Sequence, residues 1–297
     1  MSAIIAAGAL WRHFAPFGLD SGHLRRLLTR SVYYLFLPAL VLKVLWHAPI
    51  NVDSLRISAT AVSGVIFALV ITRLMYRLFT VDRPTLGAML LAASFPNVTY
   101  MGLPVLTALY GDWAGSVAIQ YDLFGTTPLL FTLGIAIASR FGADGESRFD
   151  VSEILRVPAL WAAMLAILLH FAAIAPNAAA DKVLGLLSVP VVPIMLFAIG
   201  LSLSWQHLRR HRLPLLIPVV LVQFLALPLF AWGLAGSLGL RGEWLDAVVL
   251  EAAMPCMVLG IVLCDRYGLD SALYAAAVTL TTVASLGVIP LWYSLLA

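Results

Sequence analysis

Long apolar runs, each close to the length of a membrane-spanning helix, alternate along the chain with short polar connections. About 20 apolar residues are needed to cross a hydrocarbon core of roughly 30 Å with every backbone hydrogen bond made inside the helix. Nine segments clearly meet this requirement: Ser31–Leu45, Ile57–Tyr76, Leu86–Leu109, Ala114–Ser139, Val157–Ile174, Val183–Leu203, Leu213–Leu238, Ala247–Cys264 and Ala272–Leu296. The pattern therefore predicts an all-α integral membrane protein.

A tenth, abbreviated helix is predicted at the start of the chain. Ser2–Leu10 is apolar, but at 1.5 Å per residue it reaches only about 14 Å, half of a bilayer. It is too short for a signal peptide and has neither a basic leading region nor a small-residue cleavage site. Either Phe14–Leu19 completes this helix, or the true start lies upstream of Met1. We favour an abbreviated first helix, which makes ten transmembrane helices.

Composition agrees with a surface that faces mostly lipid. Hydrophobic residues make up 62% of the chain and charged residues only 11%, and the mean hydropathy is +0.99. The net charge of +3 does not indicate a nucleic-acid partner, because the basic residues are scattered singly without interleaved aromatic residues. Cys256 and Cys264 lie in one apolar segment without nearby metal ligands, so we expect no cofactor and no metal site.

Lys and Arg are distributed unevenly among the predicted connections. Counted from the first helix, the odd connections and the adjoining helix ends hold 14 of the 18 basic residues: Arg12, Arg25, Arg26, Arg30, Arg73, Arg77, Arg83, Arg140, Arg148, Arg156, Arg209, Arg210, Arg212 and Arg266. Because such charges resist translocation, they mark the cytoplasmic side. We therefore expect a multi-pass protein of the cell (inner) membrane with both termini on the non-cytoplasmic side.

The longest polar connection divides the chain into two groups of five helices. Residues 1–139 form the first five-helix repeat, residues 140–156 a cytoplasmic linker, and residues 157–297 the second repeat. The linker carries charges of both signs, as a solvated connection would. With an odd number of helices in each half, any repeat must be inverted in the membrane.

Corresponding helices of the two halves carry similar interruptions. In the fourth helix, Ala92–Pro104 places a proline after small residues and a glycine a few positions later, and the helix leaves through Tyr110–Asp112. The ninth helix repeats this order in Ala252–Gly260 and Tyr267–Asp270, with the spacing changed by one or two residues. A lone membrane proline usually produces only a kink, but two at matching places in inverted halves indicate a binding site.

Proline removes an amide donor and clashes with the preceding turn. Pro96, with Gly102 and Pro104, therefore predicts unwinding of the fourth helix near mid-membrane, and Pro255 predicts the same in the ninth. Such backbone is tolerated only where it lines an enclosed cavity. The half-helices that begin after each break direct their positive ends to one region, which suits an anion. Asn97 adds an amide donor, unless its side chain merely caps the broken helix.

Few ionisable residues lie within the predicted spans. Asp122 in the fifth helix and Glu251, one turn before the ninth-helix break, are costly in hydrocarbon unless protonated, paired or hydrated. Both are candidates for proton coupling or for a counter-ion, and the alternative is a protonated acid bonded to a neighbouring helix. Lys43 and His170 lie near helix ends and are expected to snorkel, while Gln223 is expected to bond two helices together.

Several of these motifs, taken together, resemble the auxin efflux carriers, a family with plant and bacterial members, over essentially the whole chain. Those that resemble its first crossover helix are Ser94–Asn97, Met101–Leu106 and Tyr110–Asp112. Those that resemble its second helix, second crossover and last span are Tyr33–Leu42, Ala253–Pro255, Asp265–Tyr267 and Pro290–Trp292.

The resemblance implies ten helices in an inverted 5+5 repeat with broken crossover helices 4 and 9, and commonly a homodimer. It implies a scaffold of helices 1, 2, 6 and 7 and a transport domain of helices 3–5 and 8–10 that moves like an elevator. The family's crossover residues correspond to Pro96, Asn97 and Pro255. Around them, the predicted substrate-binding residues are Pro96, Asn97, Val98, Gly102, Pro104, Pro255, Cys256 and Met257.

Two departures argue against auxin itself as the substrate. Plant members tend to carry glutamine where this chain has Cys256, and the central loop here is short. The expected function is secondary active or potential-driven export of a small organic anion, a mono- or dicarboxylate. A sodium-coupled symporter of the bile-acid-carrier type is the alternative, although Met254–Gly260 offers hardly any sodium ligands.

Two other function classes are disfavoured. An enzyme is not expected, because zinc-ligand spacing and supporting catalytic motif residues are missing. A membrane sensor would be expected to carry a large cytoplasmic effector domain, which this sequence does not contain.

Overall fold

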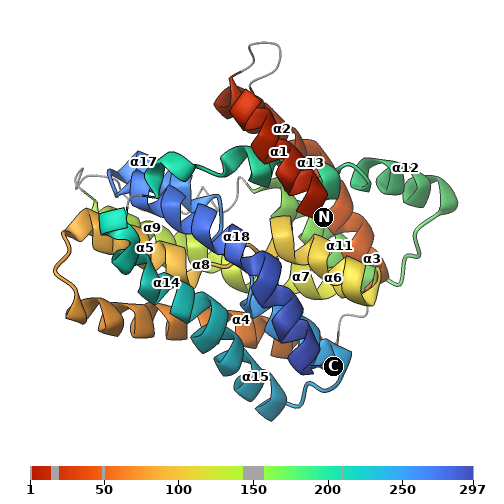
Figure 1. Ribbon diagram of the computed structural model, residues 1–297. Coiled ribbons are helices and arrows are strands. Elements are labelled where there is room, and N and C mark those ends of the chain that lie inside the picture. The colour runs from red at the N-terminus through yellow and green to blue at the C-terminus, as the bar shows by residue number, and fades with distance from the viewer. Residues whose placement is uncertain (1, 15–19, 49–50, 143–156, 209, 297) are drawn as a thin grey trace.

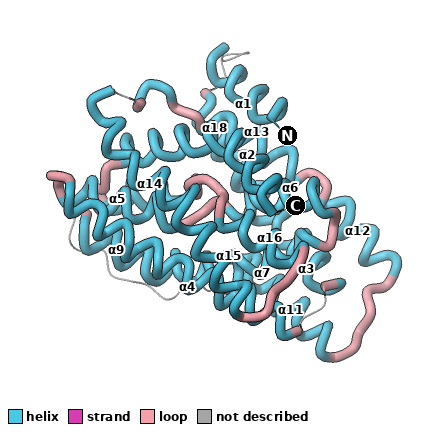
Figure 2. The backbone as a smooth tube through the Cα atoms, turned by 60° about the horizontal axis from the view of Figure 1, so that its bottom comes forward, coloured by secondary structure: helices cyan, strands magenta, loops and turns pink. Residues whose placement is uncertain are grey.

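The computed structural model describes residues 2–14, 20–48, 51–142, 157–208 and 210–296, and their regular secondary structure is helical apart from one isolated bridge (Figures 1 and 2). Within this part of the chain, six helices are long and apolar enough to cross a membrane: Ser21–His47, Val52–Leu78, Ala114–Phe141, Ala178–Ser202, Arg210–Ser237 and Ser271–Leu296. The prediction of an all-helical, multi-pass membrane protein is confirmed.

Several of these long helices combine α-helical segments with π- or 3₁₀-helical turns. Their parts are α2 (Ser21–Ser31), η2 (Val32–Phe36) and α3 (Leu37–His47); α4 (Val52–Met75) and η3 (Tyr76–Leu78); α7 (Ala114–Tyr121), η5 (Asp122–Thr126), α8 (Thr127–Leu129), η6 (Leu130–Gly134) and α9 (Ile135–Phe141); α12 (Ala178–Ser188) and α13 (Val191–Ser202); η8 (Arg210–Leu216), α14 (Ile217–Leu221), η9 (Val222–Ala226) and α15 (Leu227–Ser237); and α18 (Ser271–Leu296).

The remaining described helices are shorter. They are α1 (Ser2–Phe14), α5 (Arg83–Ser94), η4 (Val98–Gly102) with α6 (Leu103–Tyr110), α11 (Pro158–Phe171), η7 (Trp205–His207), α16 (Glu243–Ala252) and α17 (Gly260–Tyr267). Two pairs of them, α5 with η4–α6 and α16 with α17, fall where the sequence predicts interrupted spans.

One predicted boundary is wrong by about ten residues. The helix expected over Ser31–Leu45 begins at Ser21, because the Asp20 side chain caps it by accepting a hydrogen bond from the His23 amide, 2.7 Å away. Three arginines assigned to a connection, Arg25, Arg26 and Arg30, therefore lie on the helix. A search for long apolar runs missed these turns because they carry the three arginines.

Two predicted segments fall partly or wholly outside the described residues. Helix α1 continues past Leu10 to Phe14, but residues 15–19, the rest of its predicted extension, are not described. Most of the predicted 140–156 linker is likewise outside, since the description stops at residue 142 and resumes at residue 157.

Four of the π-helical turns are followed directly by an α-helix that has proline at its second position. A proline ring clashes with the carbonyl one turn earlier, and a π-helical turn widens the helix at that point. These prolines therefore lie inside helices without ending them; they are Pro38, Pro104, Pro128 and Pro228.

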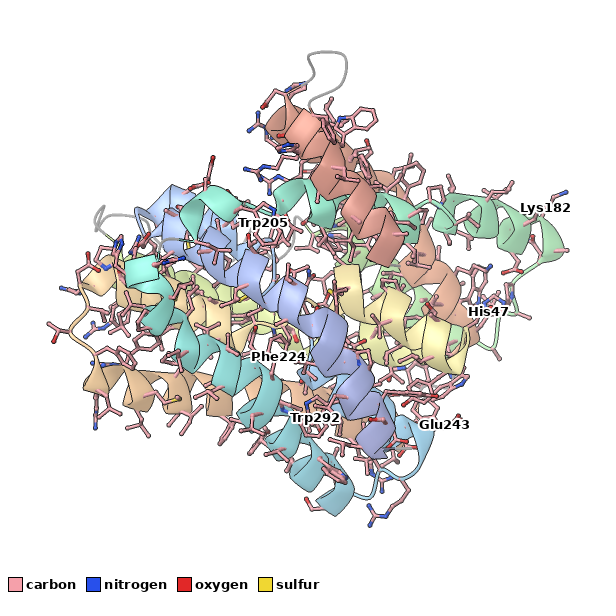
Figure 3. All side chains as sticks on the ribbon, in the orientation of Figure 1. His47, Lys182, Trp205, Phe224, Glu243 and Trp292 are labelled. Atoms are coloured by element: carbon pink, nitrogen blue, oxygen red, sulfur yellow. The ribbon has the colours of Figure 1, made fainter. Side chains whose placement is uncertain are left out.

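A tryptophan side chain joins η9 to the last helix. In η9, the Phe224 carbonyl accepts a 2.9 Å hydrogen bond from Trp292 Nε1 of α18 (Figure 3).

Helices α1 and α13 lie side by side with their backbones in contact (Figure 1). A Cβ atom added to Gly8 would lie 2.2 Å from the Phe197 carbonyl oxygen, and one added to Gly200 would lie 2.1 Å from that of Ile5. Small residues allow such close approach between membrane helices. Helix α1, although short, is therefore packed into the helical assembly.

Asp270 makes hydrogen bonds or an ion pair with the ends of three helices. Its carboxylate caps α18 by accepting from the Leu273 amide at 2.9 Å, accepts from Thr85 Oγ1 of α5 at 3.0 Å, and pairs with Arg212 of η8. Burial raises the pKa of Asp270, but these hydrogen bonds outweigh burial and hold the pKa below the ordinary 3.8. The ionised carboxylate therefore stabilises the folded state.

We expect Asp270→Asn to lower the free energy of unfolding by roughly 0.5–1 kcal/mol at pH 7. Because the folded-state pKa is depressed, this contribution is present above about pH 3.8 and is lost as the pH falls through the folded pKa. Thermal unfolding in detergent across pH should show the two proteins converging in acid. Asp112→Asn, at the exposed Tyr-Gly-Asp motif, is the matched control; an equal loss there would contradict the interpretation.

Candidate functional site

The first interruption is confined to three residues. Helix α5 ends at Ser94 and η4 begins at Val98, so Phe95–Asn97 is the only non-helical stretch between these two helices. The expected unwinding at Gly102 and Pro104 is not observed. Gly102 lies in the π-helical turn, and Pro104 follows that turn inside the continuous helix over Val98–Tyr110, where the wider turn accommodates its ring.

The second interruption runs from Ala253 to Leu259, and it pairs with the first. The Asn97 amide donates to the Pro255 carbonyl at 2.7 Å, and the Met257 amide donates to the Phe95 carbonyl at 3.0 Å. Pro96 and Cys256 thereby form an antiparallel bridge. Backbone released by each proline is satisfied by the other break, which is what buried backbone in a membrane requires. Figure 2 shows loop segments in the middle of the helical assembly.

Asn97 lies at the centre of this pairing and is only 1% exposed. Its carbonyl accepts from the amides of Met101 and Gly102 at 3.2 and 3.1 Å, so its backbone is fully used. Its side chain makes no capping bond to η4, and Nδ2 has no partner among the described residues. The alternative role of the side chain as a helix cap is therefore not observed, and an amide donor remains for a ligand.

Two carboxyl groups from different helices contact the η4 turn. Asp122 of η5 accepts hydrogen bonds from Thr99 and from Thr127, the latter at 2.8 Å. Glu251 of α16 packs against Gly102, where an added Cβ atom would lie 2.0 Å from its Oε2. Glu251 is fully buried, and neither of its carboxyl oxygens has a partner among the described residues. The two predicted acids thus flank the helix that follows the first break.

A cavity of about 50 Å³, roughly the space of one or two waters, lies beside Asn97. It is bounded by both breaks, by η5, by the helix over Ser21–His47 and by the start of α11. Its lining includes Asn97, Thr99, Tyr100, Asp122, Thr127, Met257, Leu259, Tyr33, Leu37, Val157 and Ala159. Of the predicted site residues, Asn97, Asp122 and Met257 therefore border one cavity.

Other predicted site residues lie in the surrounding structure. Cys256 donates through Sγ to the Ala92 carbonyl at 2.9 Å, and its amide donates to Thr281 at 3.1 Å. Gln223 bonds the same Ala92 carbonyl at 2.8 Å and so links η9 to α5 as expected. The predicted site residues that do not line the cavity are Pro96, Val98, Gly102, Pro104, Glu251, Pro255 and Cys256.

Sequence reasoning missed the hydroxyl groups of the site. Thr99 and Thr127 bond Asp122 and line the cavity, and Tyr100 and Tyr33 also border it. One signal was present, because a polar residue two positions after Asn97 in an otherwise apolar span requires a partner. The tyrosines gave no such signal, since aromatic residues are common in membrane helices.

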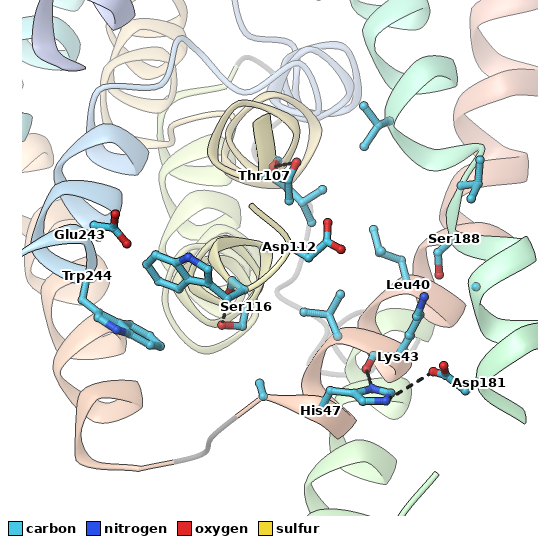
Figure 4. A pocket seen from close by; sticks show the side chains of 18 residues that line it. Leu40, Lys43, His47, Thr107, Asp112, Ser116, Asp181, Ser188, Glu243 and Trp244 are labelled. Atoms are coloured by element: carbon cyan, nitrogen blue, oxygen red, sulfur yellow. Dashed lines mark hydrogen bonds and ion pairs between the residues drawn. The ribbon is translucent and has the colours of Figure 1, made fainter. Parts of the chain in front are cut away.

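A second, larger cavity of about 890 Å³ lies near the Lys43 end of α3. Figure 4 shows Lys43, His47 and Asp112 directed toward it, and His47 Nε2 lies 3.4 Å from Asp181 Oδ1. From the sequence, Lys43 is expected only to extend its side chain from a helix end to the membrane surface. In the structure Lys43 is half-buried and lines this cavity.

These features define a class: a multi-pass membrane protein whose discontinuous helices enclose a buried polar site. A family model described as membrane transport protein matches residues 14–145 and again residues 146–293. The chain belongs to this family, the auxin efflux carriers that its motifs resemble, and is a membrane transport protein.

Individual relatives agree with the family. An uncharacterized transporter of Methanothermobacter thermautotrophicus is 33% identical over 201 residues, which cover 68% of this chain and 65% of the relative, slightly less than two thirds. The uncharacterized transporter YfdV of Escherichia coli is 25% identical over 226 residues, 73% of this chain and 70% of the relative. A proposed malonate transporter of Rhizobium meliloti is 23% identical over 273 residues, 88% of this chain and 84% of the relative.

Proposed function

We propose that the protein is a secondary active or potential-driven carrier that exports a small carboxylate across the inner membrane. The observation that carries this proposal is the unpartnered amide of Asn97, buried at the pairing of two broken helices. Helix starts at such a point favour negative charge. The relative from Rhizobium meliloti, a proposed malonate transporter, makes malonate the first substrate to test.

The proposed architecture is ten helices in an inverted 5+5 repeat with crossover helices 4 and 9. The family model matches residues 14–145 and 146–293, and the boundary between these two ranges falls within the linker predicted over residues 140–156. The paired prolines support corresponding breaks, since Pro96 and Cys256, the neighbour of Pro255, face each other in one bridge. The two repeats then span residues 1–139 and 157–297.

We propose an elevator movement, and the position of the cavity supports relative movement of two groups of helices. Tyr33, Leu37 and Ala159 belong to proposed scaffold helices, whereas Asn97 and Met257 belong to the proposed transport domain. A cavity of about 50 Å³ is too small for a dicarboxylate, because a single water already occupies ~30 Å³ of liquid. The two groups of helices must therefore move relative to each other to bind substrate. We also propose a homodimer with both termini on the non-cytoplasmic side.

The test is transport of radiolabelled malonate by purified protein in liposomes. We expect uptake that follows an imposed membrane potential or pH gradient and is inhibited by other small carboxylates. Protein-free liposomes and liposomes with the folded Asn97→Ala variant are the controls. Transport of only neutral or cationic compounds would overturn the proposal.

The sodium-coupled alternative is decided in the same assay. Asp122, Thr99 and Thr127 carry oxygen atoms of the kind that coordinate sodium, and this is the observation that favours the alternative. A strict requirement for a sodium gradient would replace the proton- or potential-driven mechanism. Equal rates in sodium and choline salts would exclude sodium coupling.

Glu251→Gln is expected to remove most of the pH dependence of transport while preserving binding. A buried carboxyl without a partner is tolerated only if it gains and loses a proton during transport or stays protonated. Glutamine imitates the protonated state permanently. Malonate exchange, which needs no net proton movement, should persist while pH-driven uptake falls at least tenfold. Unchanged pH-driven uptake in the variant would show that Glu251 is purely structural.

A further inference from the structure

One face of the continuous helix over Ser21–His47 lines three separate cavities. The residues recur three or four positions apart, as one helix face requires; they are Arg25, Thr29, Tyr33, Leu37, Leu40, Lys43 and His47. The first two border a cavity of about 50 Å³, the next two border the cavity beside Asn97, and the last three border the 890 Å³ cavity.

The three cavities follow one another along this helix face. Tyr100 and Leu259 line both the Arg25 cavity and the Asn97 cavity, so these two cavities are adjacent. On the other side, Leu37 borders the Asn97 cavity and Leu40 borders the large cavity, less than one helical turn away. The cavities therefore trace a route along this helix face, past the site.

A basic residue lies near each end of the route. Arg25 and Lys43 are 18 positions apart, which at ~1.5 Å per residue is ~27 Å, close to the thickness of the hydrocarbon core. Both side chains are half-buried at a cavity, whereas Arg26 and Arg30 on the same helix are exposed. An anion that enters either cavity therefore meets a cation that is partly removed from solvent.

We propose that this helix face is the stationary wall of the substrate path, and that Arg25 and Lys43 bind the substrate carboxylate at its two mouths. This proposal rests on the proposed carboxylate transport and adds two specificity-determining residues outside the central site. An arriving carboxylate pairs with one cation, passes Asn97, and pairs with the other on leaving. A cation at each mouth favours anions over neutral substrates of the same size.

Acidic residues also line the large cavity, and replacing one of them tests whether the substrate that binds there is an anion. Asp181 is next to His47, Asp112 belongs to the α6–α7 connection, and Glu243 begins α16. In Figure 4, Asp112 is directed toward the side of the cavity that holds Lys43, while Glu243 lies on the far side. An anion at Lys43 is therefore repelled by Asp112. Around Arg25, the interacting charges are those of Arg12, Arg26 and Asp265.

The experiment measures malonate transport separately from each face, in right-side-out and inside-out vesicles. We expect Lys43→Gln to raise KM about tenfold from one face only, and Arg25→Gln to do so from the opposite face only, because each removes one charge-assisted hydrogen bond. Asp112→Asn should lower KM from the Lys43 face. The exposed Lys182→Gln and Arg30→Gln are matched controls that should change neither value.

Equal effects of the cavity variants and their controls would overturn the proposal, as would a rise in KM from both faces for either variant. A second readout does not depend on the substrate. Thiols introduced by Leu40→Cys and Thr29→Cys should react faster with an anionic than with a cationic thiosulfonate, and loss of Lys43 or Arg25 should reduce that ratio about tenfold. The parent protein, whose Cys256 and Cys264 are buried, gives the background rate.

These readouts separate the two proposals. If wild-type protein transports no carboxylate but the thiol ratios behave as expected, the proposed function fails and the anion-selective path stands. If malonate is transported but neither the KM values nor the thiol ratios respond, the path is wrong and the proposed function stands.

Discussion

Asn97→Ala is expected to abolish stabilisation by malonate and malonate transport while the protein remains folded. The Asn97 backbone makes the bonds that hold the two breaks together, and alanine keeps all of them. The side-chain Nδ2, in contrast, has no partner among the described residues, so its loss breaks no internal hydrogen bond of this donor. The variant lacks the buried hydrogen bond from the amide to the bound anion. Such a bond contributes about 1.5–3 kcal/mol, which is more than tenfold in affinity.

Thermal unfolding of the purified protein with increasing malonate is the measurement. A ligand present at about 100 times its Kd stabilises the native state by about 2.7 kcal/mol, so the wild type should show a clear rise in Tm. Gln120→Ala is the matched control, because Gln120 is a buried amide without described partners that does not line the cavity. The site assignment would be wrong if Asn97→Ala kept the full rise in Tm, or if Gln120→Ala also lost it.

The second large effect is expected from Gly102→Ala. The added methyl group would lie 2.0 Å from Glu251 Oε2 and 2.5 Å from its Cδ, well inside contact distance. Glu251 is fully buried, so its carboxyl group must find room within the packed interior if it is to move away from the added methyl group. Overpacking of this kind costs about 1–3 kcal/mol. We therefore expect a lower Tm and transport reduced to background, because the clash moves one broken helix relative to the other.

A double-mutant cycle tests whether the contact with Glu251 causes the lower Tm of Gly102→Ala. Adding Glu251→Ala to Gly102→Ala removes the clashing carboxyl, so the double variant should recover most of the lost Tm although it will not recover pH-driven transport. Gly287→Ala in α18, where nothing lies within 4 Å of the added methyl group, should leave Tm and transport unchanged. If Glu251→Ala did not restore stability, Gly102 would be required for a reason other than its contact with Glu251.

The sequence by itself determined the class of protein and the places where its helices break. Apolar length identified the membrane helices, because hydrocarbon requires spans of a defined length with every backbone bond satisfied internally. Pro96 and Pro255 identified the interruptions, because proline removes a backbone donor wherever it occurs. Both effects depend on local chain chemistry, so they can be inferred without knowing which residues meet in space.

Only the tertiary structure decided what each break is paired with and which polar groups meet. The same local chemistry leaves Pro96 in a break and Pro104 inside a helix, because the π-helical turn before Pro104 gives its ring room. Asp122 accepts a hydrogen bond from Thr99 of η4, and Glu251 meets Gly102 from another helix. Contacts between distant segments depend on how whole helices pack, and periodicity along a single helix does not specify its neighbour.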